Sequence, residues 1–125
     1  MKHIKLFENF LNEAAHNVPE SYVRIGPEIK FETDEATYTG AIFKTQYGNG
    51  RTALEMVGTK GEFKGESILV ASVNIPEEKI EKDEVIIKNY SENEGILDVL
   101  INAKIISKPI RSASVRGAFI CKLLI

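Results

Sequence analysis

YTGAIFKTQYGNGRTALEMV, residues 38–57, is the stretch that decides the fold, because two β-rich runs flank a glycine-rich turn. Residues 38–47 and 51–57 carry the aromatic and branched side chains that strands favour. Between them, Gly48-Asn49-Gly50 supplies residues that tolerate the positive φ angles of a tight turn. The stretch therefore predicts an antiparallel β-hairpin.

Further strands are expected on both sides of this hairpin. Residues 22–32 have strand character around Pro27, which predicts an edge or a bend there because proline cannot donate to a β-ladder. Residues 67–75 are apolar on both faces at Ile68-Leu69-Val70-Ala71, which indicates a central strand covered on each side. Shorter strands are expected at residues 85–87, 104–110 and 118–125, and turns at 33–35 and around Gly58, Gly61 and Gly65.

One helix is expected at residues 91–103. Ser91 and Glu94 match a capping box, and Ile96, Leu97, Leu100 and Ile101 form an apolar stripe. The predicted fold class is α+β, with an antiparallel sheet of about 5–7 strands, the packed helix 91–103 and a separable N-terminal amphipathic helix. In domain terms, residues 1–14 are a leader, 15–19 a linker with Pro19, and 20–125 a single globular α+β domain.

The composition excludes several classes of protein. The chain has 125 residues, 43% of them hydrophobic and 27% charged, as in ordinary globular proteins. No apolar run approaches the roughly 18 residues that cross a bilayer, so we expect no membrane partner. Cys121 is the only cysteine, and we expect it to be a buried residue of a terminal strand.

Catalytic and cofactor signatures are sparse. The histidines are His3 and His16, both in or beside the leader, so the globular part has no imidazole for acid–base chemistry or for a His/Cys zinc site. The YGNGR turn lacks the Lys-Ser/Thr of a phosphate-binding loop, and the chain has no Trp for stacking on single-stranded bases. We therefore expect no enzyme, no cofactor and no metal, and consider nucleic acid an unfavoured partner.

The charge is unevenly distributed. Residues 104–125 carry 5 basic residues and no acid, whereas residues 1–103 carry 11 bases and all 18 acids. This asymmetry is compatible with a site for a phosphate-bearing small molecule, and equally with a basic edge that packs against the acidic segment 77–84. The candidate phosphate ligands are Lys108, Arg111, Ser112, Ser114 and Arg116. In an extended strand, however, Arg111 and Arg116 would point to opposite faces.

A second candidate site lies at the start of the predicted helix. Tyr90 and Asn93 could hold a polar ligand, although capping and turn formation explain the same residues. Glu92 and Glu94 would repel an anion there, so a neutral or cationic group suits it better. A third pair, Tyr47 and Arg51, flanks the hairpin tip, where a solvent-exposed turn is the simpler interpretation.

The first fourteen residues, MKHIKLFENFLNEA, read as an amphipathic helix. One side carries the apolar residues Ile4, Phe7, Phe10, Leu11 and Ala14, and the other carries polar ones. A helix this short is marginal alone in water and needs a partner surface. One alternative is that the segment packs permanently on the sheet of its own chain.

Two resemblances bear on function. Leu11-Asn12-Glu13-Ala14 resembles the end of the capsid-targeting leaders of T-even-like phages, which a prohead protease cleaves after the Glu, here Glu13. YGNGRTALEMV, ASVNIP, EVIIKNYSENEGILDVLINAKII and VRGAFICKLL, in that order, resemble an uncharacterised family of small phage and mobile-element proteins. The family resemblance implies a genomic setting and no catalytic residues.

These resemblances imply a non-enzymatic phage accessory protein. Such a protein would be packaged in the virion interior through a phage head component, delivered to the host cytoplasm, and act by binding a host defence or regulatory component. Two alternatives remain: a cytoplasmic small-molecule protein that binds a nucleotide signal, and a virion structural or decoration protein docked by its N-terminal helix.

Overall fold

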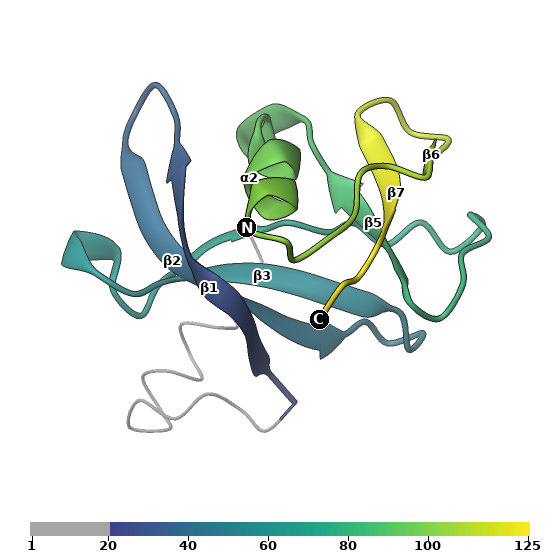
Figure 1. The fold of residues 1–125 in the computed structure, drawn as a ribbon, viewed down its shortest axis with the longest axis horizontal. Coiled ribbons are helices and arrows are strands. Elements are labelled where there is room, and N and C mark those ends of the chain that lie inside the picture. Colours follow the sequence, from purple (N-terminus) through teal and green to yellow (C-terminus); the bar gives the residue numbers. More distant parts are fainter. Residues whose placement is uncertain (1–20) are drawn as a thin grey trace.

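The computed structural model describes residues 21–125, so the predicted leader and linker lie outside the described residues. The larger sheet is antiparallel, with strand order β1-β2-β3-β4, and Figure 1 labels its strands β1, β2 and β3. Its strands are β1 (Val23–Glu32), β2 (Thr37–Gln46), β3 (Thr52–Gly58) and β4 (Ser67–Val70). We call it the first sheet.

The predicted hairpin is confirmed as β2 and β3. Gln46 pairs with Thr52 at the end of the ladder, and the Tyr47 N–H donates to the Arg51 carbonyl at 2.8 Å. Gly50, with φ of 85°, closes the turn by donating to the Tyr47 carbonyl at 2.9 Å. A residue with a side chain rarely adopts that φ, which is why glycine is needed at this position.

The expected bend at Pro27 is also confirmed. β1 is an edge strand, and its register against β2 shifts between Ile25 and Ile29. Gly26 has φ of 73° at this irregularity, and Pro27 follows it. A proline here removes no donor from the interior of the ladder.

A second antiparallel sheet has the order β5-β7-β6, with β5 (Glu84–Lys88), β6 (Arg111–Ser112) and β7 (Ala118–Lys122). Residues 71–73 connect the two sheets. The Ala71 N–H donates to Leu54 at 2.7 Å, whereas the Ala71 carbonyl accepts from Lys88 at 2.8 Å. The structure therefore confirms an α+β fold built from antiparallel strands.

The predicted central strand at residues 67–75 needs correction. β4 ends at Val70 and lies at an edge of the first sheet, with alternate residues buried. Residues 68–71 are apolar on both faces because the chain here leaves the first sheet and passes to the second sheet. Ala71 and Ser72 are enclosed between β3 and β5.

The predicted helix 91–103 is present, but it begins differently. Residues Ser91–Asn93 form a 3₁₀ turn, and α2 runs over Ile96–Asn102. The capping box is wrong: Ser91 has φ of 54° and makes no capping bond. Instead the Asn89 side-chain oxygen accepts from the N–H groups of Gly95 at 3.1 Å and Leu97 at 3.0 Å, and so acts as the cap.

The predicted strand 104–110 is largely wrong, because Lys104 ends the helix in a left-handed conformation with φ of 60°. The Lys104 N–H donates to Ile101, and the Ile105 N–H donates to Leu100 at 3.1 Å, which is the pattern of a Schellman cap. Ile105 and Ile106 are then buried as loop residues, with a single bridge from Ile106 to Leu123.

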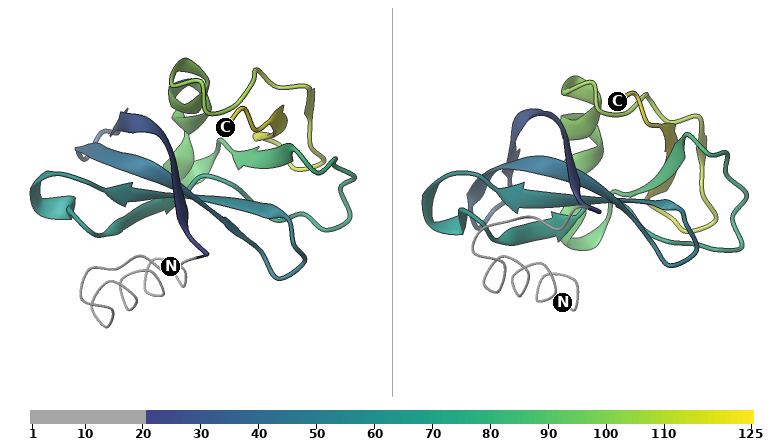
Figure 2. Two further views of the ribbon diagram at one scale, coloured as in Figure 1. Left: turned by 60° about the horizontal axis from the view of Figure 1, so that its bottom comes forward. Right: turned by 90° about the horizontal axis from the view of Figure 1, so that it is seen from below.

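The core lies between the first sheet and the layer that covers it. Figures 1 and 2 show α2 and the second sheet on the same side of the first sheet. Ile42, Leu54 and Met56 of the first sheet are fully buried there with Ile96 and Leu100 of α2. Cys121 in β7 is completely buried, as expected, and its burial raises the pKa of the thiol to about 11.

Candidate ligand-binding site

A pocket of about 470 Å³ opens where the hairpin end of β2 and β3 meets the corner after β5. One wall comes from the hairpin, one from the crossing between the sheets, and one from the corner of residues 88–93. The lining residues used below are Tyr22, Tyr47, Gly48, Ala53, Glu55, Val70, Ser72, Lys88, Tyr90, Glu92 and Asn93.

Glu55 is the most unusual residue of this pocket. Leu54 and Met56 point into the core, so strand alternation turns Glu55 to the opposite face of β3, where it lines the pocket. Its exposed fraction is only 4%, and its Oε2 accepts a hydrogen bond from the Ser67 hydroxyl at 2.7 Å. Burial raises the pKa of Glu55 to about 7, although the Ser67 hydrogen bond partly opposes this shift.

Two hydroxyl groups are fixed next to this carboxyl. The Tyr47 hydroxyl and the Ser72 hydroxyl are hydrogen-bonded at 2.8 Å, and Ser72 Oγ also accepts from the Leu54 N–H at 2.9 Å. Burial raises the pKa of Tyr47, and the nearby Glu55 carboxylate adds to that shift. Burial, and after it the Glu55 carboxylate, also raises the pKa of Tyr22.

The opposite wall holds a cation that is already neutralised. Lys88 Nζ lies 2.8 Å from the Glu92 carboxylate and 5.3 Å from the centre of the Tyr90 ring. These contacts occupy the ammonium group with one ion pair and one cation–π contact. A positively charged side chain is therefore present, but its charge is directed at Glu92 and Tyr90.

The structure brings Tyr90 and Asn93, the second predicted site, into this pocket. Asn93 is 1% exposed, and its amide donates to the Val70 carbonyl at 2.6 Å. That bond ties the corner to β4, so Asn93 has a structural role whatever the pocket binds. Tyr90 contributes its ring to the pocket lining.

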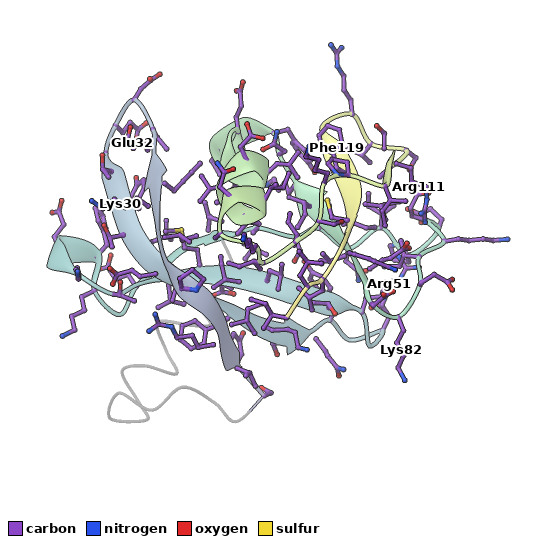
Figure 3. The ribbon with its side chains drawn as sticks, viewed as in Figure 1. Lys30, Glu32, Arg51, Lys82, Arg111 and Phe119 are labelled. Atoms are coloured by element: carbon purple, nitrogen blue, oxygen red, sulfur yellow. The ribbon has the colours of Figure 1, made fainter. Side chains whose placement is uncertain are left out.

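The first predicted site, the basic segment 108–116, does not belong to this pocket. Arg111 forms an ion pair with Glu84 at 3.2 Å and donates to the Lys79 carbonyl at 2.7 Å, toward the loop before β5 (Figure 3). The Ser114 N–H donates to the Glu78 carboxylate at 2.6 Å, and Lys122 lies 3.7 Å from Asp83. The basic tail thus faces the acidic segment 77–84, as one of the two alternatives predicted. Ser112 lies in β6, and Lys108 and Arg116 are exposed.

Tyr47 and Arg51 are half-buried, so the simple exposed turn is wrong for these two side chains. Arg51 points to the loop that follows β4 and donates to the carbonyls of Ile75 at 2.7 Å, Pro76 at 3.3 Å and Glu78. The guanidinium therefore holds the hairpin end to that loop (Figure 3). Tyr47 alone of the pair lines the pocket.

Sequence reasoning missed Glu55, Ser72 and Lys88. The available signal for Glu55 was a single carboxylate within the otherwise apolar strand ALEMV. Nothing in the sequence indicates that Ser72 and Lys88 meet the hairpin, because that contact depends on how the two sheets join.

Comparison of the chain with known protein families, with curated proteins and with solved structures finds no match. Within residues 21–125, no group of three or more His, Cys, Asp or Glu side chains could hold a metal ion. No helix in that described part has the length and apolar character needed to cross a membrane.

Proposed function

We propose that this chain is a non-enzymatic binding protein whose pocket beside the hairpin end receives a small polar ligand. The observation that carries the proposal is Glu55, a carboxyl placed in a pocket wall with 4% exposure. Burying a carboxyl is unfavourable unless it is hydrogen-bonded, and among residues 21–125 the Ser67 hydroxyl supplies a bond to Glu55 Oε2. A ligand donor that reached the pocket-facing carboxyl would provide a further bond.

The polar groups of the pocket favour binding over catalysis. Tyr47 and Ser72 are bonded to each other, and Lys88 is paired with Glu92. A general base must lie within hydrogen-bond reach of the proton that it takes from a reacting group, whereas Tyr47, Ser72 and Lys88 each contact another side chain of the pocket wall. The pocket is also better supported than the basic segment 108–116, because Arg111 is engaged with Glu84.

A variant that fills the pocket tests the proposal. Gly48 lines the pocket, and a Cβ added there meets nothing within 4 Å, so Gly48→Trp places a large ring at the opening without a backbone clash. Lys82→Trp, at an exposed position that does not line the pocket, is the matched control. A thermal-shift screen of small polar metabolites should find a compound that stabilises the unchanged chain and Lys82→Trp but not Gly48→Trp. Stabilisation that survives in Gly48→Trp would contradict the pocket as the site.

A second proposal concerns where the protein acts, and the leader pattern Leu11-Asn12-Glu13-Ala14 favours it. The chain would be a phage accessory protein, packaged in the head, cleaved after Glu13 and delivered to the host, where it binds a defence or regulatory component. Mass spectrometry of purified virions should then find a peptide that begins at Ala14. A peptide that begins at Met1 would support a virion protein docked by its N-terminal helix, and absence from virions would contradict both.

A further inference from the structure

We infer that the ligand of this pocket is a small organic cation whose ammonium or guanidinium N–H groups bind the Glu55 carboxylate. This inference rests on the proposed binding function and adds the chemical class of the ligand. It follows from the placement of one buried carboxyl among aromatic rings, in a pocket whose own cation is already paired.

The first argument is the charge that a ligand would meet. Glu55 and Glu92 line the pocket, and among the lining side chains that the structure describes Lys88 is the basic one. Because Lys88 Nζ lies 2.8 Å from Glu92, its charge is balanced within the pocket wall. An anionic ligand would have to compete with Glu92 for Lys88 and would also face Glu55. A cation would find that no basic side chain within residues 21–125 is paired with Glu55.

The second argument is the aromatic lining. Tyr22, Tyr47 and Tyr90 all contribute to the pocket. The face of an aromatic ring carries partial negative charge and attracts cations within about 6 Å of its centre. Lys88 Nζ already uses the Tyr90 ring in this way, at 5.3 Å. Rings combined with a carboxylate provide both attraction and a hydrogen-bond acceptor for an organic cation.

The third argument is the protonation of Glu55. With its pKa at about 7, the side chain is partly protonated near neutral pH. A cation that binds the carboxylate form must displace that proton, so binding and deprotonation are linked. The other titratable groups that face Glu55 across the pocket are Tyr22, Tyr47, Lys88 and Glu92, of which both tyrosines stay neutral because their pKa values are raised.

The test uses two probes of nearly the same shape, n-butylguanidinium, which is a cation, and n-butylurea, which is neutral. Each is titrated into the isotope-labelled full chain at pH 8 and at pH 5.5, and amide shifts of Tyr47, Ala53 and Glu55 report binding in the pocket. Glu55→Gln keeps the size of the side chain and removes its charge. Glu94→Gln, at an exposed position outside this pocket, is the matched control.

At pH 8 we expect the cation to bind at least tenfold more tightly than the urea. Its affinity should fall by roughly tenfold for each pH unit below the Glu55 pKa, while the affinity of the urea stays constant. Glu55→Gln should abolish the preference, and Glu94→Gln should retain it. Equal affinities at pH 8, or a preference that survives in Glu55→Gln, would overturn the cationic class.

The outcomes also separate this inference from the proposed function. If the urea alone shifts the pocket resonances, the pocket binds ligands and the cationic class is wrong. If neither probe shifts them up to its solubility limit, both the ligand class and the binding function of the pocket are contradicted.

Discussion

Glu55 is the single residue on which the interpretation of this molecule depends. A strand position between Leu54 and Met56 ordinarily carries an apolar or a solvated side chain on its outer face. Here the carboxyl is buried and keeps a hydrogen bond from Ser67 at 2.7 Å. Retaining an ionisable group in such a place lowers stability at neutral pH, which is a common property of functional sites.

The first prediction concerns Glu55→Gln and the pH dependence of stability. The pKa of Glu55 is raised in the folded chain, so the folded state holds a proton that the unfolded state loses between about pH 4.5 and pH 7. The free energy of unfolding should therefore decrease as the pH rises through this range, by roughly 3 kcal/mol from this group. Glu55→Gln keeps an acceptor for the Ser67 hydroxyl but has no titrating carboxyl, so the free energy of unfolding should no longer decrease over this pH range.

Urea denaturation at pH 5 and pH 8 measures this effect. The variant should lie within about 1 kcal/mol of the unchanged chain at pH 5 and exceed it in stability by a larger margin at pH 8. Glu94→Gln, which is exposed, should change neither value. The same pH dependence in Glu55→Gln as in the unchanged chain would show that Glu55 is not the group responsible.

At the scale of single elements, α2 shows how a short sequence motif can predict a helix and yet give the wrong capping residue. Ser91 and Glu94 have the spacing of a capping box, but Gly95, with φ of 99°, delays the helix to Ile96. The N–H groups of the first turn then point at Asn89, which precedes the predicted cap. The spacing predicted that a helix begins near this point, but it could not show which polar side chain would reach its N–H groups.

The second prediction follows from this cap. Asn89→Ala should destabilise the chain by about 1 kcal/mol, because it removes the acceptor for both Gly95 and Leu97. Asn89→Asp, which keeps that oxygen, should have a smaller effect. Ser91→Ala is the control and should lie within about 0.5 kcal/mol of the unchanged chain by chemical denaturation. A larger loss of stability for Ser91→Ala than for Asn89→Ala would contradict the assignment of Asn89 and favour Ser91 as the capping residue.

The third prediction concerns the contact between the hairpin and the loop after β4. Arg51 donates to carbonyls of Ile75, Pro76 and Glu78, so Arg51→Ala should lower the free energy of unfolding by about 2 kcal/mol. Arg51→Lys keeps the charge but cannot reach several carbonyls with one planar group, and it should recover only part of the loss. Full recovery by lysine in denaturation experiments would mean that charge alone, without the guanidinium geometry, holds the loop.

Across the elements, the successful predictions are those that depend on neighbours in sequence. The hairpin follows from Gly48-Asn49-Gly50 between two β-rich runs, and the bend follows from Pro27. The strand expected at residues 104–110 fails because Lys104 takes the left-handed conformation usually filled by glycine. No residue type in that segment signals such a cap.

On the scale of the whole molecule, residues 21–125 combine two small sheets and α2 into a layered arrangement (Figures 1 and 2). The α+β class was predictable from the strand-rich sequence and the stripe of residues 96–101. The division into two sheets was not, because it depends on residues 71–73 pairing with both β3 and β5. The pocket depends on the same junction, so the sequence pointed only to Tyr90 and Asn93 as one candidate site and to Tyr47 as part of another, and it did not join them into one pocket.

The distribution of charge is also a property of the whole molecule. The basic tail meets the acidic segment 77–84 through Arg111 with Glu84 and Lys122 with Asp83. A backbone hydrogen bond from Glu81, and after it the Arg111 guanidinium, holds the pKa of Glu84 below its usual range. Two of the five basic residues in 104–125 thus form ion pairs with the acidic segment 77–84.

The most direct measurement is a carbon-13 NMR titration of the Glu55 side-chain carboxyl in the intact chain, without added ligand. A carboxyl buried in a pocket wall should titrate with a midpoint near 7, well above the exposed glutamates measured in the same spectrum. A midpoint near 4.5 would mean that Glu55 is solvated, and the pocket would then lose the feature on which its proposed function rests.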